Sequence, residues 1–284
     1  MEERSDLMTI FNNARFVLRH FVRGYYPVAP GQKSAMPVNR IFIPLANPNG
    51  EKNYIAEEGK KHILIPGFLY YTPAFLPVEF SLDEGLYFLS IQNNFEIFPG
   101  VELFSNCPSM TVIPNPPQVK ELLSLLDSPR EKRHLDSLRA GSSFLSIQAQ
   151  LLDHYKEEDF FQPLALKEYT LLTDYLKENG NARTSVSDLA NLYHESRENF
   201  TRHFSRRINM TPKALIDRFV MNRTLHLLGS GRSIKECADH LSFSNEFVFS
   251  RYFKRNMGES PSSWLKRQYI PSSGEKERKK RRKI

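Results

Sequence analysis

The first half of the chain contains short apolar or alternating runs that are separated by turn-forming residues. The turn signals are Asn47–Gly50, Pro66–Gly67, Asp83–Gly85 and Pro99–Gly100, where proline, glycine and asparagine favour a reversal of the chain. The runs between them are Phe16–Val22, Arg40–Leu45, His62–Ile65, Val78–Leu82 and Leu86–Ile91. Many short strands with regular turns predict a β-sandwich or barrel up to about residue 113.

The apolar period then changes to that of a helix. One stripe recurs every seven residues at Leu138, Leu145 and Leu152, with a partner series at Leu135, Ser142 and Ala149. A second stripe runs through Phe144, Ile147, Leu151 and Tyr155. The pattern predicts a helix from Glu131 to about Lys156. One stripe is expected to cover the β-domain of its own chain while the other meets the same helix of a second chain, so we expect a homodimer through Leu138, Leu145 and Leu152.

The second half contains an internal repeat. Ser185–Ala190 and Ser233–Ala238 match in residue type at an offset of 48, and each starts with a serine followed three residues later by an acid, the capping box of a helix start. Further along, the offset becomes 49 and joins the following pairs: Phe200 and Phe249, Arg202 and Arg251, Phe204 and Phe253, Arg206 and Arg255, Asn209 and Gly258, Pro212 and Pro261. Asn and Gly tolerate the left-handed conformation that ends a helix. Both copies therefore predict a short capped helix, a tight turn and a second helix, with the extra residue in the turn or at the start of the second helix.

Such a unit is a helix-turn-helix, whose second helix lies in the DNA major groove. The phenylalanines at i and i+4 face the core, and the positions between them face outward. Arginine contacts guanine, asparagine adenine, glutamate cytosine and phenylalanine the thymine methyl group. The alternative is that these positions are solvated helix faces. The candidate DNA-binding residues are Arg197, Glu198, Asn199, Thr201 and Arg202 in the first unit, and Asn245, Glu246, Phe247, Ser250 and Arg251 in the second.

Between the two units, Lys213 to about Leu228 predicts one helix, with Ile216, Phe219, Val220 and Leu227 on a common face. A rigid rod of this kind fixes two recognition helices relative to each other. At a separation of about 34 Å they enter successive major grooves on one side of the duplex.

The charge distribution agrees with DNA binding by the second half alone. Residues 1–162 carry 15 basic and 19 acidic side chains, a net −4, and residues 163–270 carry 17 and 11, a net +6. The tail from Pro271 carries 7 and 2, a net +5, and we expect it to add sequence-independent attraction to phosphates. No run approaches the ~20 apolar residues of a membrane helix. The two cysteines lie far apart, and the charged start Met1–Arg4 is followed by no apolar segment, so we expect a cytoplasmic protein without a disulfide framework.

The second half resembles the AraC/XylS family of bacterial regulators from about Leu164 to Gln268. The match is carried by Phe243–Arg255 with Gly258–Pro261, and by Ser196, Phe200–Phe204 and Met210–Pro212. Ser242 stands where the family usually has glycine, Val220 where it has arginine and Thr224 where it has alanine. The resemblance implies a cupin-like effector domain in the first half, and contact with RNA polymerase during activation.

Six polar or aromatic side chains of the strand region are candidates for binding an effector such as a sugar: Arg40, Tyr54, His62, Tyr70, Tyr71 and Gln92. The alternative is that the aromatic residues fill the core and the polar groups lie at its rim. The histidines are scattered, and the sequence contains no zinc motif, nucleophile elbow or phosphate-binding glycine loop. We therefore expect no catalytic residues, metal or cofactor.

The sequence predicts an α+β protein: residues 1–117 as a cupin-like β-sandwich or barrel that senses an effector, 118–162 as a helical connector that dimerises, 163–270 as a double helix-turn-helix domain that binds double-stranded DNA, and 271–284 as a basic tail. The expected function is a transcription regulator, and an activator in particular, rather than an enzyme. Two alternatives stay open: a ligand-independent or architectural DNA-binding protein, and a cupin-type enzyme with a DNA-binding appendage.

Overall fold

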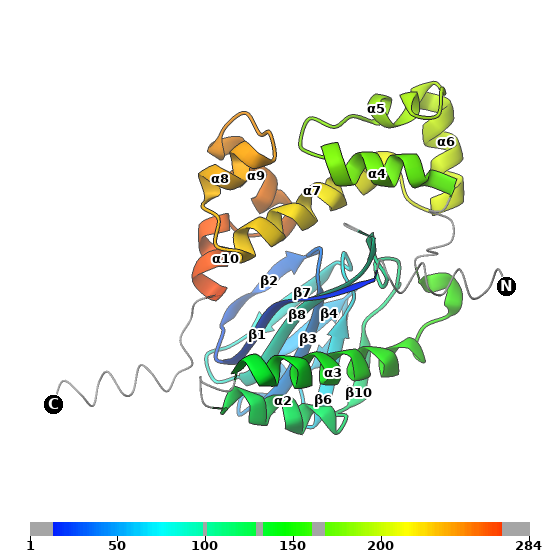
Figure 1. Cartoon of the computed structure of the whole chain (residues 1–284). Helices are drawn as coiled ribbons and strands as arrows, with labels where there is room; N and C mark the ends of the chain where they lie inside the picture. The colour runs from blue at the N-terminus through cyan, green and yellow to red at the C-terminus, as the bar shows by residue number, and fades with distance from the viewer. Residues whose placement is uncertain (1–13, 99–100, 129–132, 161–167, 269–284) are drawn as a thin grey trace. The chain divides into compact units, whose positions relative to one another are not determined.

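The computed structural model describes residues 14–98, 101–128, 133–160 and 168–268 (Figure 1). They form two compact units, each described by itself below. A sheet unit is built from Leu18–Asn94 and Cys107–Asp159, and a helical unit from Phe95–Asn106 and Phe160–Leu265. The predicted α+β class, with antiparallel sheets followed by a helical region, is confirmed. The predicted basic tail lies outside the described residues.

The strands form two antiparallel sheets, which belong to the sheet unit except for residues 15–17, 95–98 and 101–102, which cluster with the helical unit. The first has the strand order β1–β8–β3–β6–β10, with β9 paired to β8, and the second has the order β2–β7–β4–β5. The strands of the first sheet are β1 (Arg15–Gly24), β3 (Asn39–Ala46), β6 (Phe68–Thr72), β8 (Tyr87–Phe98), β9 (Val101–Glu102) and β10 (Thr111–Pro114). Those of the second are β2 (Val28–Ser34), β4 (Tyr54–Glu57), β5 (Lys60–Ile63) and β7 (Val78–Leu82), with a short 3₁₀ helix at Gly50–Lys52 before β4.

The core of this sandwich lies between the sheets. Alternate residues of each strand point inward, as the period of two requires, so Phe42 of β3 meets Phe80 of β7 with ring centroids 5.2 Å apart. Phe88 of β8 lies 5.6 Å from Phe42, and the buried Tyr70 and Ile55 belong to the same cluster. The apolar alternation of the sequence therefore places one face of each sheet in a shared core.

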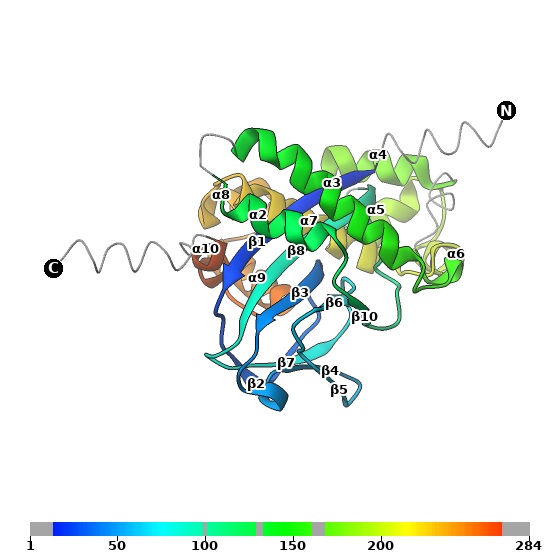
Figure 2. The ribbon, with the colours of Figure 1, turned by 90° about the horizontal axis from the view of Figure 1, so that it is seen from below.

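Helices α2 (Gln118–Leu126) and α3 (Arg133–Leu152) cover the other face of the first sheet (Figure 2). Phe144 of α3 packs edge-on against Phe21 of β1 at 5.3 Å, and Gln148 donates to Asn93 of β8 at 2.6 Å. The stripe Phe144, Ile147 and Leu151 is buried. α3 ends at Leu152 instead of continuing to Lys156, because the chain turns there and the backbone N–H of His154 donates to Leu151 O at 3.2 Å.

The helical unit contains, in the described part of the chain, the helices α4 (Thr170–Asn179), α5 (Val186–Asn191), α6 (Arg197–Ile208), α7 (Pro212–Gly229), α8 (Ile234–His240), α9 (Glu246–Met257) and α10 (Pro261–Gln268). α7 is the predicted rod, with α5 and α6 near its start and α8 and α9 near its end (Figure 1). The 18 residues of α7 span about 27 Å. Val220 and Thr224 are buried on α7, where Thr224 Oγ1 donates to Val220 O at 2.9 Å.

Candidate nucleic-acid interface

Two helix-turn-helix units occur in the helical unit at the predicted repeat. Ser185 and Ser233 start α5 and α8 with complete capping boxes, in which the N3 residues Asp188 and Glu236 bond back to the cap. The second helices α6 and α9 both have 12 residues. α6 ends at Asn209 (φ 53°) and α9 at Gly258 (φ 75°), both left-handed. Local side-chain chemistry therefore sets the start and end of both recognition helices.

The turns of the two units have the same geometry. The N–H of Glu195 donates to Ala190 O at 3.2 Å, and the N–H of Phe243 donates to Ala238 O at 2.9 Å, so the offset is still 48 at this point. The N-caps of the second helices, Ser196 and Asn245, are 49 apart. The extra residue is therefore Ser244, directly before the second recognition helix.

Each turn holds one non-glycine residue in the left-handed region, His194 (φ 54°) and Ser242 (φ 59°). A residue with a Cβ is destabilised by about 1–2 kcal/mol in this region. Replacing it with glycine removes this strain, but part of the gain is lost because glycine gives the unfolded chain more conformational freedom. We expect Ser242→Gly to raise the free energy of unfolding by about 0.5 kcal/mol. Ser242→Val should lower it, because a β-branched residue fits this region worst.

This prediction is measured by urea unfolding, monitored through the fluorescence of Trp264, the single tryptophan of the chain. Trp264 is buried beside the second helix-turn-helix unit, with its ring centroid 6.0 Å from that of Phe253. The order Gly, Ser, Val in decreasing stability is the expected result. Equal stability of all three variants would contradict a strained turn.

The inner faces of the recognition helices bury matching residues. Phe200, Phe204 and Ile208 are buried on α6, and Phe249, Phe253 and Met257 on α9. The candidate DNA-binding residues lie on the opposite, outward faces, where all are exposed except the half-buried Thr201 and Ser250. The hydroxyl of Thr201 donates to Arg197 O at 2.7 Å.

On α6, Arg202 Nη2 donates to Asn199 Oδ1 at 2.9 Å. This contact between positions i and i+3 orients the guanidinium across the outer face. Arg207 of the same helix is instead paired with Glu168. Of these two arginines, Arg202 is therefore the one that keeps N–H donors available for an external partner.

On α9, Phe247 is 81 % exposed and Arg251 is exposed beside it on the outward face. Asn245 has a different role, because its Oδ1 accepts the N–H of Val248 at 2.9 Å and so starts the helix. A bidentate contact with adenine needs that oxygen. Asn245 therefore starts the helix through its Oδ1 and presents its Nδ2 group as the donor available to a base.

Exposed cations also lie on the later turns of both helices. Arg206 of α6 and Lys254 of α9 are exposed, and Arg255 lies over the Tyr252 ring at 5.6 Å. They were not among the candidates from the sequence. Their spacing from Arg202 and Arg251, at three or four residues, was the signal that placed them on the same side of the helix.

The six candidate effector residues do not converge on one site. Arg40 and Gln92 are opposite each other in the register of β3 and β8, and with Tyr70 they face the sandwich interior. His62 pairs with Ile55, a core residue, and so faces the interior from the second sheet. Tyr71 points to the opposite side of its sheet, with its ring 6.4 Å from that of Tyr155. Tyr54 precedes Ile55 on β4 and so lies on the outer face of the second sheet.

Arg40 is the most unusual of these residues, because its side chain is fully buried. Its guanidinium donates to Ser34 Oγ at 3.3 Å and to Leu76 O at 3.1 Å, and it lies 5.2 Å from the Phe80 ring centre. Burial lowers the pKa of Arg40 to about 9. Tyr70 has a structural role in the same interior, since its hydroxyl donates to Ile63 O and accepts from the N–H of Ile65.

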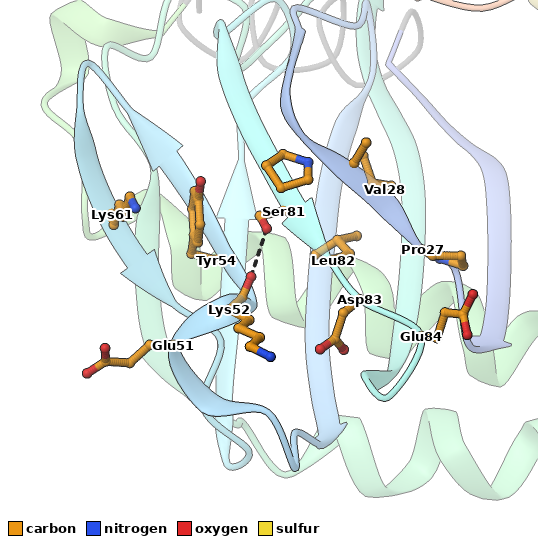
Figure 3. Close-up of a pocket in the computed structure, with 12 residues that line it drawn as sticks. Pro27, Val28, Glu51, Lys52, Tyr54, Lys61, Ser81, Leu82, Asp83 and Glu84 are labelled. Atoms are coloured by element: carbon orange, nitrogen blue, oxygen red, sulfur yellow. Dashed lines mark hydrogen bonds between the residues drawn. The ribbon is translucent and has the colours of Figure 1, made fainter.

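Tyr54 lines a groove of about 710 Å³ on the second sheet (Figure 3). The wall is formed by Pro27–Pro30, by Glu51 and Lys52, by Lys61 and by Ser81–Glu84. Figure 3 shows Lys52 between Glu51 on one side and Asp83 and Glu84 on the other. The groove therefore combines an aromatic ring with hydrogen-bond donors and acceptors.

Two contacts hold the groove in shape. Lys61 Nζ lies 4.3 Å above the Tyr54 ring centre, a cation–π contact, and Ser81 Oγ donates to Lys52 O at 2.8 Å. Asp83 accepts hydrogen bonds from Asn49 and Asn53, which lower its pKa against the opposing effect of desolvation. Asp83 therefore stays ionised and serves the turn as well as the groove.

The leucine stripe of α3 points away from its own sheet. Leu138 is 80 % exposed, and Leu135, Leu145 and Leu152 are exposed as well. An apolar stripe of this length on a helix whose opposite face is already buried is an unpartnered surface.

Within the described ranges, no three His, Cys, Asp or Glu side chains are grouped as metal ligands. No helix among the described residues has both the length and the apolar character that a bilayer crossing requires.

Comparison with known proteins agrees with this geometry. A family described as a helix-turn-helix domain matches residues 189–267. The raffinose operon transcriptional regulatory protein RafR of Pediococcus pentosaceus is 28% identical over 150 residues, covering 52% of this chain and 53% of the relative. The transcriptional regulatory protein HptR of Staphylococcus aureus is 30% identical over 113 residues, covering 38% of this chain and 45% of the relative. The chain thus spans about half the length of these curated relatives.

Among solved structures, the wild-type ToxT of Vibrio cholerae with a bound unsaturated fatty acid has a TM-score of 0.57 at 11% identity. The alignment covers 91% of this chain and 97% of ToxT. At that identity the likeness concerns the fold, and it extends over both the sheet region and the helical region.

Proposed function

We propose that the protein is a sequence-specific DNA-binding transcription regulator, because residues 189–267 match a helix-turn-helix domain family and the same region resembles the AraC/XylS family. The observation that carries the proposal is the pair of equal recognition helices, α6 and α9, joined by one rod. Their outward faces differ, with Arg202 and Asn199 on one and Arg251 and Phe247 on the other. Two different faces read two different half-sites.

The mode of regulation follows from the resemblance to the AraC family. We propose activation through contact with RNA polymerase, and sensing by the sheet unit with DNA binding by the helical unit. An effector that binds one conformation better than another shifts the population of the DNA-binding state. This makes the protein a regulator and not an enzyme.

We further propose that the protein is a homodimer through α3. The support is the exposed stripe of Leu138, Leu145 and Leu152, because the other apolar stripe of α3 is buried in its own chain. Pairing of two such stripes removes apolar surface from water at about 25 cal/mol per Å².

For this interface, we expect Leu138→Glu combined with Leu145→Glu to give a monomer, because two buried carboxylates oppose association. Light scattering at micromolar concentration measures the mass. Lys120→Glu, an exposed change on α2, is the matched control and should stay dimeric. A wild-type protein that is already monomeric would remove the proposal.

The effector is proposed to be a small hydroxyl-rich molecule such as a sugar, bound in the groove at Tyr54. The support is the mixture of donors, acceptors and an aromatic ring around about 710 Å³, since ligand sites combine apolar walls with a few polar groups. One relative is the regulator of a raffinose operon. A fatty acid, the ligand bound to ToxT, is the alternative class.

The experiment is selection of binding sites from a random DNA library at near-physiological salt, with and without a cell metabolite extract. Enrichment of two short boxes about one helical turn apart is the expected result. No enrichment in either condition would remove the sequence-specific regulator and favour an architectural DNA-binding protein.

An effect of the extract is then tested with Tyr54→Ala and Lys52→Ala. Both should abolish the effect while leaving binding without extract unchanged. Lys60→Ala, next to the groove but outside its wall, is the control. If both groove variants keep the effect, the groove is not the effector site.

A further inference from the structure

The two helix-turn-helix units are linked by more than the rod α7. The loop Gly180–Thr184, which leads into α5 of the first unit, bonds to the turn of the second unit. The N–H of Ala182 donates to Leu241 O at 2.9 Å, and Arg183 Nε donates to Ser242 O at 3.2 Å. These are successive carbonyls of the turn that leads to the N-cap Asn245.

The loop itself is held by its own hydrogen bonds. Asn181 accepts from the N–H of Arg183 at 2.9 Å through Oδ1, and its own N–H donates to Thr184 Oγ1 at 3.1 Å. Thr184 directly precedes Ser185, the N-cap of α5. The loop therefore forms a short, ordered connection between the turn of the second unit and the first helix of the first unit.

Arg223 of α7 closes this connection against the rod. Its Nη1 donates to Gly180 O at 2.8 Å, and its Nη2 lies 3.2 Å from His240 Nε2 at the end of α8. A Cβ at Gly180 would lie 2.5 Å from the Phe219 ring, so the loop is pressed against α7. One guanidinium thus contacts the loop of the first unit and the first helix of the second.

From these contacts we infer that Arg183 and Arg223 are positioning residues, which set the separation and relative rotation of the two recognition helices although they lie on neither of them. A rod alone fixes where each unit is attached, and the loop restricts how each unit swings about that attachment. The inference rests on the proposed binding to two half-sites. It adds which residues decide the spacing between those half-sites.

The consequence for DNA is a sharp preference for one spacing. Shifting a half-site by one base pair moves it by about 3.4 Å and rotates it by about 34°, which a braced pair of helices cannot follow. Each hydrogen bond corresponds to roughly a five-fold change in an equilibrium constant. Binding to the selected spacing should therefore exceed binding to sites one base pair longer or shorter by about ten-fold or more.

The test compares affinities for these three spacings in the full-length protein. We expect Arg183→Ala and Arg223→Gln to reduce the discrimination to less than about three-fold, mainly by weakening binding at the preferred spacing. Arg232→Ala is the matched control, because it removes the same charge beside α8, where Arg232 forms an ion pair with Glu236 at 3.6 Å. It should weaken all spacings equally. Unchanged discrimination between the spacings in both Arg183→Ala and Arg223→Gln would overturn the inference.

A second measurement is independent of DNA recognition. Spin labels at Arg206 and Lys254, both exposed on the outward side of α6 and α9, report the distance between the recognition helices, and the two native cysteines are buried. A narrow distance distribution in the wild type, broadened by Arg183→Ala or Arg223→Gln, is expected. If the distribution keeps its width, Arg183 and Arg223 do not position the recognition helices, even where DNA binding succeeds. If it broadens while no DNA site is selected, the positioning role of the two arginines holds and the proposed function fails.

Discussion

Replacing Arg202 or Arg251 with alanine is expected to cost about 1–3 kcal/mol of specific binding each, a loss of about 5- to 150-fold in affinity. Both side chains are exposed at equivalent positions of α6 and α9, where a recognition helix presents its residues to the major groove. Their half-sites are separate, so the two losses should add in the double variant.

The salt dependence distinguishes what each arginine contacts. Loss of a phosphate contact lowers the slope of log affinity against log salt by about one, whereas loss of a base contact leaves it unchanged and relaxes the preference at one base. Fluorescence anisotropy over a salt series, on the selected site and on a scrambled site, gives both quantities. Arg207→Ala is the control on the same helix, because that guanidinium is paired with Glu168, and its affinity should equal that of the wild type. A loss below about 0.5 kcal/mol for both Arg202→Ala and Arg251→Ala would show that other residues read the DNA.

The helix-turn-helix units were predictable because their boundaries depend on neighbouring residues. Serine caps, acids at N3 and left-handed Asn or Gly act within a few positions, so the repeat alone located α5, α6, α8 and α9. The role of Asn245 was less clear from the pattern. Asparagine is both a reader of adenine and a strong N-cap, and its bond to the N–H of Val248 gives the second role.

The sheet unit was less predictable because its sites depend on register between distant strands. β2 contains Pro30 and Gly31, which sequence patterns treat as a turn, and it pairs with β7 around an irregularity between Val28 and Gln32. The candidate effector residues could not be assigned to faces for the same reason. A shift of one residue moves a side chain to the opposite face, and so Tyr54 lies in the groove while His62 faces the interior.

The two stripes of α3 illustrate a further limit. Both are apolar at helical spacing, and periodicity alone does not say which one covers the chain's own sheet. Packing decides it: the larger stripe with Phe144 fits against Phe21 at 5.3 Å, and the leucines remain outside.

The largest effect on stability is expected from Phe249→Ala in α9. Phe249 is fully buried, with ring centroids 5.4 Å from Phe243 and 6.3 Å from Phe253. Truncation of a buried phenylalanine costs about 3–5 kcal/mol, because the transfer free energy is lost and a cavity remains. That is a large share of the 5–15 kcal/mol that stabilise a typical domain.

Phe247, two residues earlier on the same helix, is the matched control because it is 81 % exposed. Urea unfolding followed at Trp264 should show the midpoint of Phe249→Ala lowered by roughly 2 M, with that of Phe247→Ala unchanged. DNA binding without urea should show the opposite for Phe247→Ala. This variant folds normally but loses affinity for sites with thymine at the contacted step. One helix then separates the two tasks, with the inward phenylalanine holding the unit together and the outward one reading the groove. A lowered midpoint for Phe247→Ala would place that ring in the core and remove it from the interface.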